Sequence, residues 1–207
     1  MAQVETGIRS VLSIPIVYNF LQNTLGASNV RKELAEKYLN FERVERVLDI
    51  GCGTAELLQW IPENVEYVGF DASKVYIKAA QDRYNDRNAR FFTKCISEVD
   101  LHDTEPFDLI TAVGVIHHLC NIEVEKLFKV AAHALKDKGI FVSIDPCYVS
   151  DQSFISKAFI DRDRGQNVRT SKQYSQLAER VFKRVTSHHR NDLLRIPYDY
   201  SILVCSI

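Results

Sequence analysis

The chain has 207 residues, of which 46% are apolar, so it can bury a full core in one domain of ordinary size. This composition excludes a short disulfide scaffold and a disordered chain. The 26 Lys and Arg residues almost balance the 27 Asp and Glu residues, for a formal net charge of −1. Because no overall positive field results, we expect neither nucleic acid nor a membrane as a partner.

The five cysteines are widely scattered, odd in number and form no C-x-x-C pair. This spacing predicts neither a disulfide framework nor a zinc site, and we expect no bound metal. The sequence MAQVETGIRS carries Glu5 and lacks the apolar run of a secretory signal. No apolar run approaches the roughly 20 residues that span a bilayer. We therefore expect a soluble cytoplasmic protein that acts as a monomer or homodimer.

Hydrophobic periodicity predicts two helices in the first forty residues, near 16–25 and 28–40. Short apolar runs then alternate with stretches at helical spacing. Strands are expected at 46–50, 66–70, 89–93, 107–113 and 140–145, with helices at 54–61, 73–86 and 122–135. Strands that alternate with helices of this length predict a parallel sheet with helices on both faces.

The pattern changes after the fifth strand. Residues 146–170 are polar and rich in charge, and they interrupt the alternation. A helix is expected over 171–182, followed by strands at 183–188 and 200–206. The segment between these two strands is too short for a helix, so the strands should pair antiparallel. The sequence thus predicts seven strands, mostly parallel with one reversed at the edge.

A glycine turn follows the first strand of the alternating region. Gly51 and Gly53 stand where the backbone must turn sharply and where a ligand can approach it closely. Asp71 ends the next strand, roughly 20 residues later, at the position where a carboxylate can accept both hydroxyl hydrogens of a ribose. Because the glycine turn and Asp71 follow consecutive strands, together they favour a nucleoside-containing ligand. The alternative is that the glycines only make a tight turn and Asp71 only caps its helix.

The charges around this turn indicate which nucleoside it would bind. A dinucleotide site needs a third glycine, and Glu56 stands in its place. A carboxylate there would repel a diphosphate, which disfavours NAD. Asp49 adds a second negative group, which suits a ligand with an ammonium or a sulfonium. S-adenosylmethionine carries both and a ribose; an NAD-dependent oxidoreductase and a non-catalytic cofactor-binding module are the alternatives.

Four segments in order are similar to motifs of the class I S-adenosylmethionine-dependent methyltransferases: 49–55, 68–73, 107–119 and 135–142. The resemblance implies an α/β fold with a Rossmann-like, seven-stranded, mostly parallel sheet, one antiparallel edge strand and helices on both faces. It divides the single domain into an N-terminal helical cap, a cofactor-binding core, a substrate lid, and a last helix with antiparallel strands: 1–42, 43–145, 146–170 and 171–207.

The resemblance also implies a set of cofactor contacts. They are Tyr18, Asp49, Gly51, Cys52, Gly53, Asp71, Ala72, Cys95, Ile96, Val113 and Gly114. Many family members carry an acid after the third strand that contacts the adenine, whereas this chain has Cys95 followed by Ile96. Tyr18 would cover the methionine end of the cofactor, or else pack its ring against the core.

Methyl transfer to a hydroxyl or an amine needs a group that removes a proton beside the activated methyl. His117 and His118 follow the fourth strand and Asp145 ends the fifth, so these three are the catalytic candidates. The alternatives are that His118 shapes its loop and that Asp145 caps a turn. His188 and His189 alternate along a strand and face opposite ways, so they should not share a metal.

The charge-dense segment after the fifth strand can fold over the site as a lid. Its polar groups suit a small, hydroxylated or anionic acceptor. Residues 161–169 and 193–198 resemble bacterial small-molecule methyltransferases of surface-sugar or secondary-metabolite pathways, which implies a sugar or a similar acceptor, methylated at oxygen. The substrate-binding candidates are Tyr148, Arg162, Arg164 and Arg169. The alternative is that these charges pair with one another and with solvent.

Overall fold

The computed structural model describes residues 26–95, 101, 104–163 and 165–207. Within this part of the chain the main sheet has the strand order β3-β2-β1-β4-β5-β8-β7, and the two-residue β6 pairs with β5. The strand bounds are β1 Arg46–Ile50, β2 Glu66–Asp71, β3 Ala89–Thr93, β4 Phe107–Val113, β5 Leu135–Tyr148, β6 Arg169–Thr170, β7 Arg184–Arg190 and β8 Tyr200–Ser206.

The strand order reverses at β1. This strand pairs in parallel with β2 on one side and with β4 on the other, so the chain winds outward in both directions from it. β5 continues the parallel set, whereas β8 runs antiparallel to both β5 and β7. The predicted fold class is confirmed, and the reversed strand β8 lies between β5 and the outermost strand β7.

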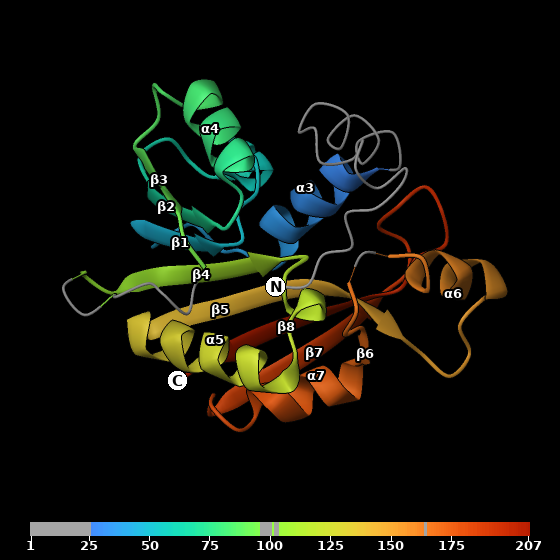
Figure 1. Ribbon diagram of the computed structural model, residues 1–207. Coiled ribbons are helices and arrows are strands. Elements are labelled where there is room, and N and C mark those ends of the chain that lie inside the picture. Colours follow the sequence, from blue (N-terminus) through green and yellow to red (C-terminus); the bar gives the residue numbers. More distant parts are fainter. Residues whose placement is uncertain (1–25, 96–100, 102–103, 164) are drawn as a thin grey trace.

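Helices cover both faces of the sheet (Figure 1). α3 and α4 lie on one face with the short 3₁₀ helix η1, and α5 and α7 lie on the other. The helical bounds are α3 Ala27–Lys37, η1 Glu56–Trp60, α4 Lys74–Arg83, η3 Ile116–His118, α5 Asn121–Ala134, α6 Phe154–Ile160 and α7 Ser171–Ala178. Val47 and Leu48 of β1 are both fully buried and belong to different apolar clusters, as expected when successive side chains point to opposite faces.

Several elements differ from the sequence-based expectation. The expected helix at 54–61 is the 3₁₀ helix η1, which follows Ala55 in a left-handed conformation and ends before Pro62. The fifth strand continues past residue 145, because its last residues pair with β6 and β8. The lid contains α6. The expected helix at 16–25 lies outside the described residues. No described helix has the length and apolar character needed to cross a membrane.

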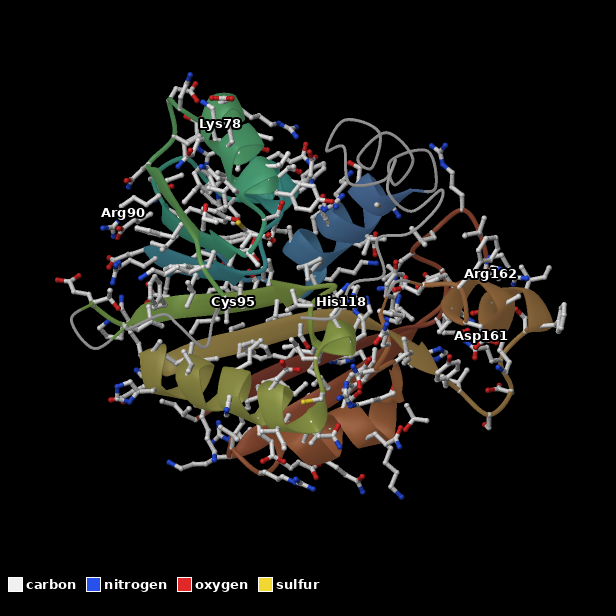
Figure 2. All side chains as sticks on the ribbon, viewed as in Figure 1. Lys78, Arg90, Cys95, His118, Asp161 and Arg162 are labelled. Carbon is white, nitrogen blue, oxygen red and sulfur yellow. The ribbon has the colours of Figure 1, made fainter. Side chains whose placement is uncertain are left out.

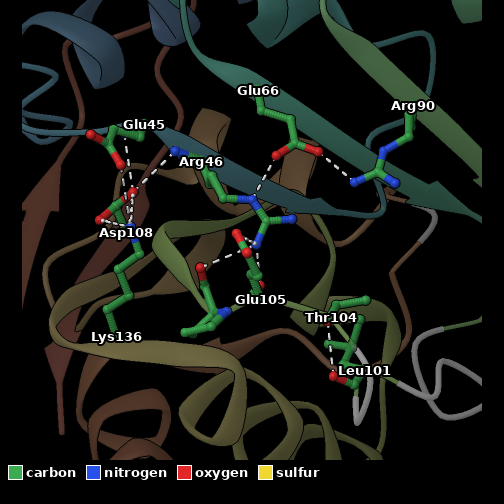
Figure 3. Close-up of polar contacts among 10 residues, drawn as sticks. Glu45, Arg46, Glu66, Arg90, Leu101, Thr104, Glu105, Asp108 and Lys136 are labelled. Carbon is green, nitrogen blue, oxygen red and sulfur yellow. Dashed lines mark hydrogen bonds and ion pairs between the residues drawn. The ribbon is translucent and has the colours of Figure 1, made fainter.

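Ion pairs gather at the opposite end of the parallel strands from the glycine turn, where β1, β2 and β4 begin (Figure 3). Arg46 Nε lies 2.6 Å from Glu66 Oε2, and this hydrogen bond lowers the pKa of Glu66. Asp108 Oδ2 accepts from the Arg46 amide at 3.0 Å, and Asp108 Oδ1 lies 2.9 Å from Lys136 Nζ. These contacts connect the starts of β1, β2, β4 and β5.

Candidate functional site

One pocket of about 1090 Å³ opens at the carboxyl ends of the parallel strands, beside β1 and β4 where the strand order reverses. This is the position where open α/β sheets bind their ligands. We call the part formed by the β1 and β2 exits the turn end; it is lined by Asp49, Gly51, Cys52, Gly53, Glu56, Asp71, Ala72 and Cys95. We call the part formed by the lid and the β7–β8 connection the lid end; it is lined by Pro146, Phe159, Arg162, Asp163, Leu194, Ile196, Tyr198 and Tyr200.

The glycine turn has the backbone conformation that its sequence predicts. Gly51 and Gly53 have φ angles of 70° and 57°, in the left-handed region that glycine adopts without strain. A Cβ atom on Gly51 would lie only 2.5 Å from Val115 Cγ2. The turn therefore requires glycine at position 51 for both its conformation and its packing.

Asp71 lies beside this turn and is hydrogen-bonded to it. Its Oδ2 accepts from the Gly53 amide at 3.0 Å and its Oδ1 accepts from the Ser73 amide at 2.7 Å. Burial raises the pKa of Asp71. A carboxylate offers about four acceptor positions. The two amides use two of them, so Asp71 can still accept from a pair of ligand hydroxyls.

Asp49 lies beneath the turn, 2% exposed. Its two oxygens accept from Tyr67 Oη at 2.6 Å and from Thr111 Oγ1 at 2.7 Å. Burial raises the pKa of Asp49 to about 6, so the group is ionised at neutral pH. Because both oxygens are engaged by the protein, Asp49 acts on a ligand mainly through its negative charge. Tyr67 belongs to no sequence motif from which its hydrogen bond to Asp49 could be predicted.

His117 is held between two carboxylates. Its Nδ1 lies 2.7 Å from Asp145 Oδ1, and its Nε2 lies 3.2 Å from Asp163 Oδ1. Burial lowers the pKa of His117, but the two carboxylates outweigh this effect and raise it to about 9. His117 is therefore an imidazolium at neutral pH, with both ring nitrogens donating. In this arrangement it cannot take a proton from a substrate.

These contacts extend across the lid. Tyr198 Oη donates to Asp163 Oδ2 at 2.9 Å, so Asp145, His117, Asp163 and Tyr198 form one hydrogen-bonded chain, which we call the clamp. Gly165 packs directly on the His117 ring, and a Cβ atom there would lie 1.9 Å from His117 Cδ2. The clamp joins β5, the exit of β4, the lid and the β7–β8 connection.

His118 is the second histidine of the β4 exit. It lines the pocket, is half-buried, and its ring centroid lies 4.0 Å from that of His117. Figure 2 shows it between the exit of β3, marked by Cys95, and the lid, marked by Arg162. Asp145, in contrast, is 1% exposed and accepts from the backbone amide and the ring of His117. Asp145 thus positions His117.

The predicted substrate residues have different surroundings. Arg169 is buried and donates to Ile116 O, Asn167 O and Leu119 O and to the Asn121 side chain. It thus holds the β4 exit loop in place. Tyr148 donates to Asp161 Oδ1 at 2.8 Å and does not line the pocket, whereas Arg162 does.

The structure brings most of the predicted cofactor residues to one pocket. Those that line it are Asp49, Gly51, Cys52, Gly53, Asp71, Ala72, Cys95, Val113 and Gly114. Tyr18, Ile96 and Arg164 lie outside the described residues. Sequence reasoning did not name Arg31, Phe159, Ile196, Tyr198 or Tyr200 as site residues, although all five line the pocket. Ile196 and Tyr198 belong to the 193–198 segment, which carried a family resemblance without an assigned role.

His188 and His189 contact different partners. The His188 ring packs edge-on against Tyr38, and His189 Nε2 lies 2.7 Å from Asp199 Oδ1. Asp199 also accepts from Ser156 Oγ at 2.6 Å and Gln152 Nε2 at 2.9 Å, which ties the lid to the β7–β8 connection. In the described part of the chain, the His, Cys, Asp and Glu side chains form no group of three arranged to hold a metal.

The family model described as a methyltransferase domain matches residues 48–141. The carboxy-S-adenosyl-L-methionine synthase of Helicobacter pylori (strain G27) is 29% identical over 154 residues, which cover 72% of this chain and 61% of that protein. The ubiquinone biosynthesis O-methyltransferase of Bradyrhizobium diazoefficiens is 30% identical over 98 residues, covering 47% and 38%. The chain therefore spans less than two thirds of the length of these curated relatives.

A solved structure resembles the whole described arrangement. The crystal structure of the plantazolicin methyltransferase BamL, in complex with a triazolic desmethylPZN analog and SAH, superposes with a TM-score of 0.70. The alignment covers 98% of this chain and 92% of that one, at 17% sequence identity. At this identity, the likeness shows the fold.

Proposed function

We infer that this chain is a class I S-adenosylmethionine-dependent methyltransferase, which binds S-adenosylmethionine at the turn end of the pocket and methylates a small-molecule acceptor at oxygen. One observation carries the cofactor half of this proposal. The Gly51–Gly53 turn and the Asp71 carboxylate face each other at the exits of β1 and β2, and Asp71 keeps acceptor positions for a ribose diol.

The turn end fits this cofactor in charge as well as in shape. Asp71 would accept the ribose hydroxyls, and Gly51 and Gly53 let a ligand approach the backbone. The ionised Asp49 beneath the turn favours a cationic ligand, as a sulfonium or an ammonium is. Glu56 is 6% exposed at the start of η1 and pairs with Arg83. Glu56 stands where a dinucleotide site has its third glycine, which argues against the NAD alternative.

When bound, S-adenosylmethionine supplies an activated methyl group and a good leaving group. The protein must therefore orient the acceptor and take its proton. Of the two histidines at the β4 exit, His117 is already protonated and is held by Asp145 and Asp163. We assign proton removal to His118, which lines the pocket beside it. The acceptor oxygen gains the methyl group and loses its proton to His118.

Three observations support a small acceptor and transfer to oxygen. The net charge of −1 offers no field for a polyanionic substrate. The lid end is a bounded part of a pocket, and the lid that covers it is fixed by the clamp. One relative is named for O-methylation in ubiquinone biosynthesis. Arg162, on the lid, is placed to contact a polar group of the acceptor.

Calorimetric titration with S-adenosylhomocysteine tests the cofactor half. We expect binding to the wild type, and a loss of about 2 kcal/mol or more in Asp71→Asn, because one ribose hydroxyl loses a charged acceptor. Asp82→Asn is the matched control, since Asp82 lies on the surface of α4 and pairs with Lys78. Wild-type protein that does not bind the nucleoside, or Asp71→Asn with unchanged affinity, would contradict the assignment.

A further inference from the structure

The pocket is larger than one ligand needs. Pockets for drug-sized molecules measure roughly 300–1,000 Å³, and this one measures about 1090 Å³. The turn end carries the acidic groups, whereas the lid end is built from different segments: the end of β5, α6 with the following loop, and the β7–β8 connection. The lid end therefore provides a second compartment, and its chemistry can be considered separately.

Most of the lid end is lined by apolar side-chain atoms. Its apolar walls are Pro146, Phe159, Leu194 and Ile196, together with the rings of Tyr198 and Tyr200. The two tyrosine rings lie against each other, with their centroids 5.0 Å apart and their planes inclined by 48°. Phe159, on the lid helix α6, lines the same pocket and is 42% exposed. Such walls suit the faces and edges of a planar ring.

Most polar groups at this end are already engaged by the protein, and Arg162 keeps donors for one polar group of the acceptor. Asp163 Oδ1 lies 3.2 Å from His117 Nε2 and accepts from the Gly165 amide at 2.8 Å, and Asp163 Oδ2 accepts from Tyr198 Oη. Arg162 Nη1 donates to Ala158 O at 2.9 Å. A polyol here would turn several hydroxyls toward carbon, and each hydroxyl that loses water without a new partner costs free energy.

We propose that the acceptor is an aromatic molecule with a phenolic hydroxyl, and that Phe159, Ile196 and Tyr200 select it. This inference rests on the proposed function, since it names the substrate class of the same site. The ring lies among the apolar walls, and its hydroxyl is directed to His118, which takes the phenolic proton as the oxygen gains the methyl group. The proposal departs from the sugar-like acceptor that the family resemblance of the lid sequence implied.

The helix α6 offers a matched pair of variants for the test. Phe159 lines the pocket, whereas Phe154, on the same helix, is 85% exposed and does not line it. We would measure methyl transfer to 2-naphthol and to methyl glucoside, and the binding of both by saturation-transfer NMR in the presence of S-adenosylhomocysteine. Phe159→Ser should raise KM for 2-naphthol by roughly tenfold or more. Phe154→Ser should leave it unchanged.

The readouts separate the two proposals. If S-adenosylhomocysteine binds by calorimetry but 2-naphthol neither binds nor reacts, or methyl glucoside is preferred, the aromatic acceptor is wrong and the cofactor assignment stands. Equal effects of Phe159→Ser and Phe154→Ser would also overturn the selection by Phe159. If S-adenosylhomocysteine itself does not bind, the proposed function fails, and the acceptor proposal fails with it. Preferential binding of 2-naphthol that depends on Phe159 supports the inference.

Discussion

The clamp should make the stability of the fold depend on pH. The pKa of His117 is about 9 in the folded state, against 6.5 for an ordinary histidine. Because the folded pKa is the higher one, the stabilisation is complete below pH 6.5 and is lost as the pH rises through 9. A difference of 2.5 units corresponds to about 3 kcal/mol, at 1.36 kcal/mol per unit. For a chain of this size that equals roughly 6–12 °C in melting temperature.

The measurement is the free energy of unfolding in urea between pH 6 and pH 9.5, for the wild type and for His117→Gln. We expect the difference between the two curves to shrink by about 3 kcal/mol over this range, because only the wild type holds the titrating imidazolium. His133→Gln, at an exposed site in the last turn of α5, is the control and should follow the wild type. Asp163→Asn keeps an oxygen that can accept from the His117 ring but removes the carboxylate charge. The pKa of His117 should therefore fall, and the pH at which the stabilisation is lost should fall with it.

Parallel curves for the wild type and His117→Gln would refute this reasoning. They would mean that the two carboxylates do not hold the imidazolium more tightly than water does. An Asp163→Asn transition at the wild-type pH would refute the part assigned to the lid, since His117 would then respond to Asp145 alone.

Other variants test neighbouring features. Asp49→Asn should stabilise the fold by up to about 3 kcal/mol at pH 7.5, since ionisation of a buried acid with a pKa near 6 opposes folding above that pH. It should also weaken calorimetric binding of S-adenosylmethionine more than of S-adenosylhomocysteine, which lacks the sulfonium charge. Gly165→Ala should cost about 1–3 kcal/mol in urea unfolding, because its Cβ collides with His117. Arg169→Met should lower the free energy of unfolding by about 3 kcal/mol or more, because it leaves buried carbonyls without a donor. For each of Asp49→Asn, Gly165→Ala and Arg169→Met, an unchanged urea midpoint would contradict the structural role assigned to that residue.

The sequence predicted which residues gather at the turn end of the pocket, for a physical reason. Gly51, Gly53 and Asp71 follow consecutive strands, and parallel strands bring their carboxyl ends to the same edge of the sheet. The strand bounds at 46–50, 89–93, 107–113 and 200–206 also agree with the structure, because apolar runs between turn residues mark buried strands. Local sequence patterns were sufficient to predict the turn end, because its residues directly follow strands that the sequence marks.

The lid half could not be predicted in the same way. The charge-dense run after β5 predicted arginines that bind substrate, yet Arg169 lies inside, bonded to carbonyls about 50 residues away in sequence. Asp163 pairs with His117 across a similar separation, which raises the pKa of a residue expected to act as a base. A single sequence shows which charges are present but does not show which distant partners they meet. Tyr198 and Ile196 were not assigned to the site, because a resemblance of the 193–198 segment does not show which of its side chains face the pocket.

The anchoring of the lid has a consequence for how a molecule enters the pocket. Arg169 fastens the end of the lid to the β4 exit, and Asp199 fastens its beginning through Gln152 and Ser156. These contacts oppose a rigid swing of the whole lid. We therefore expect exchange through rotation of exposed side chains such as Phe159 and Arg162. Such rotations take picoseconds to nanoseconds, whereas lid opening takes microseconds or longer, so the entrance would not limit turnover.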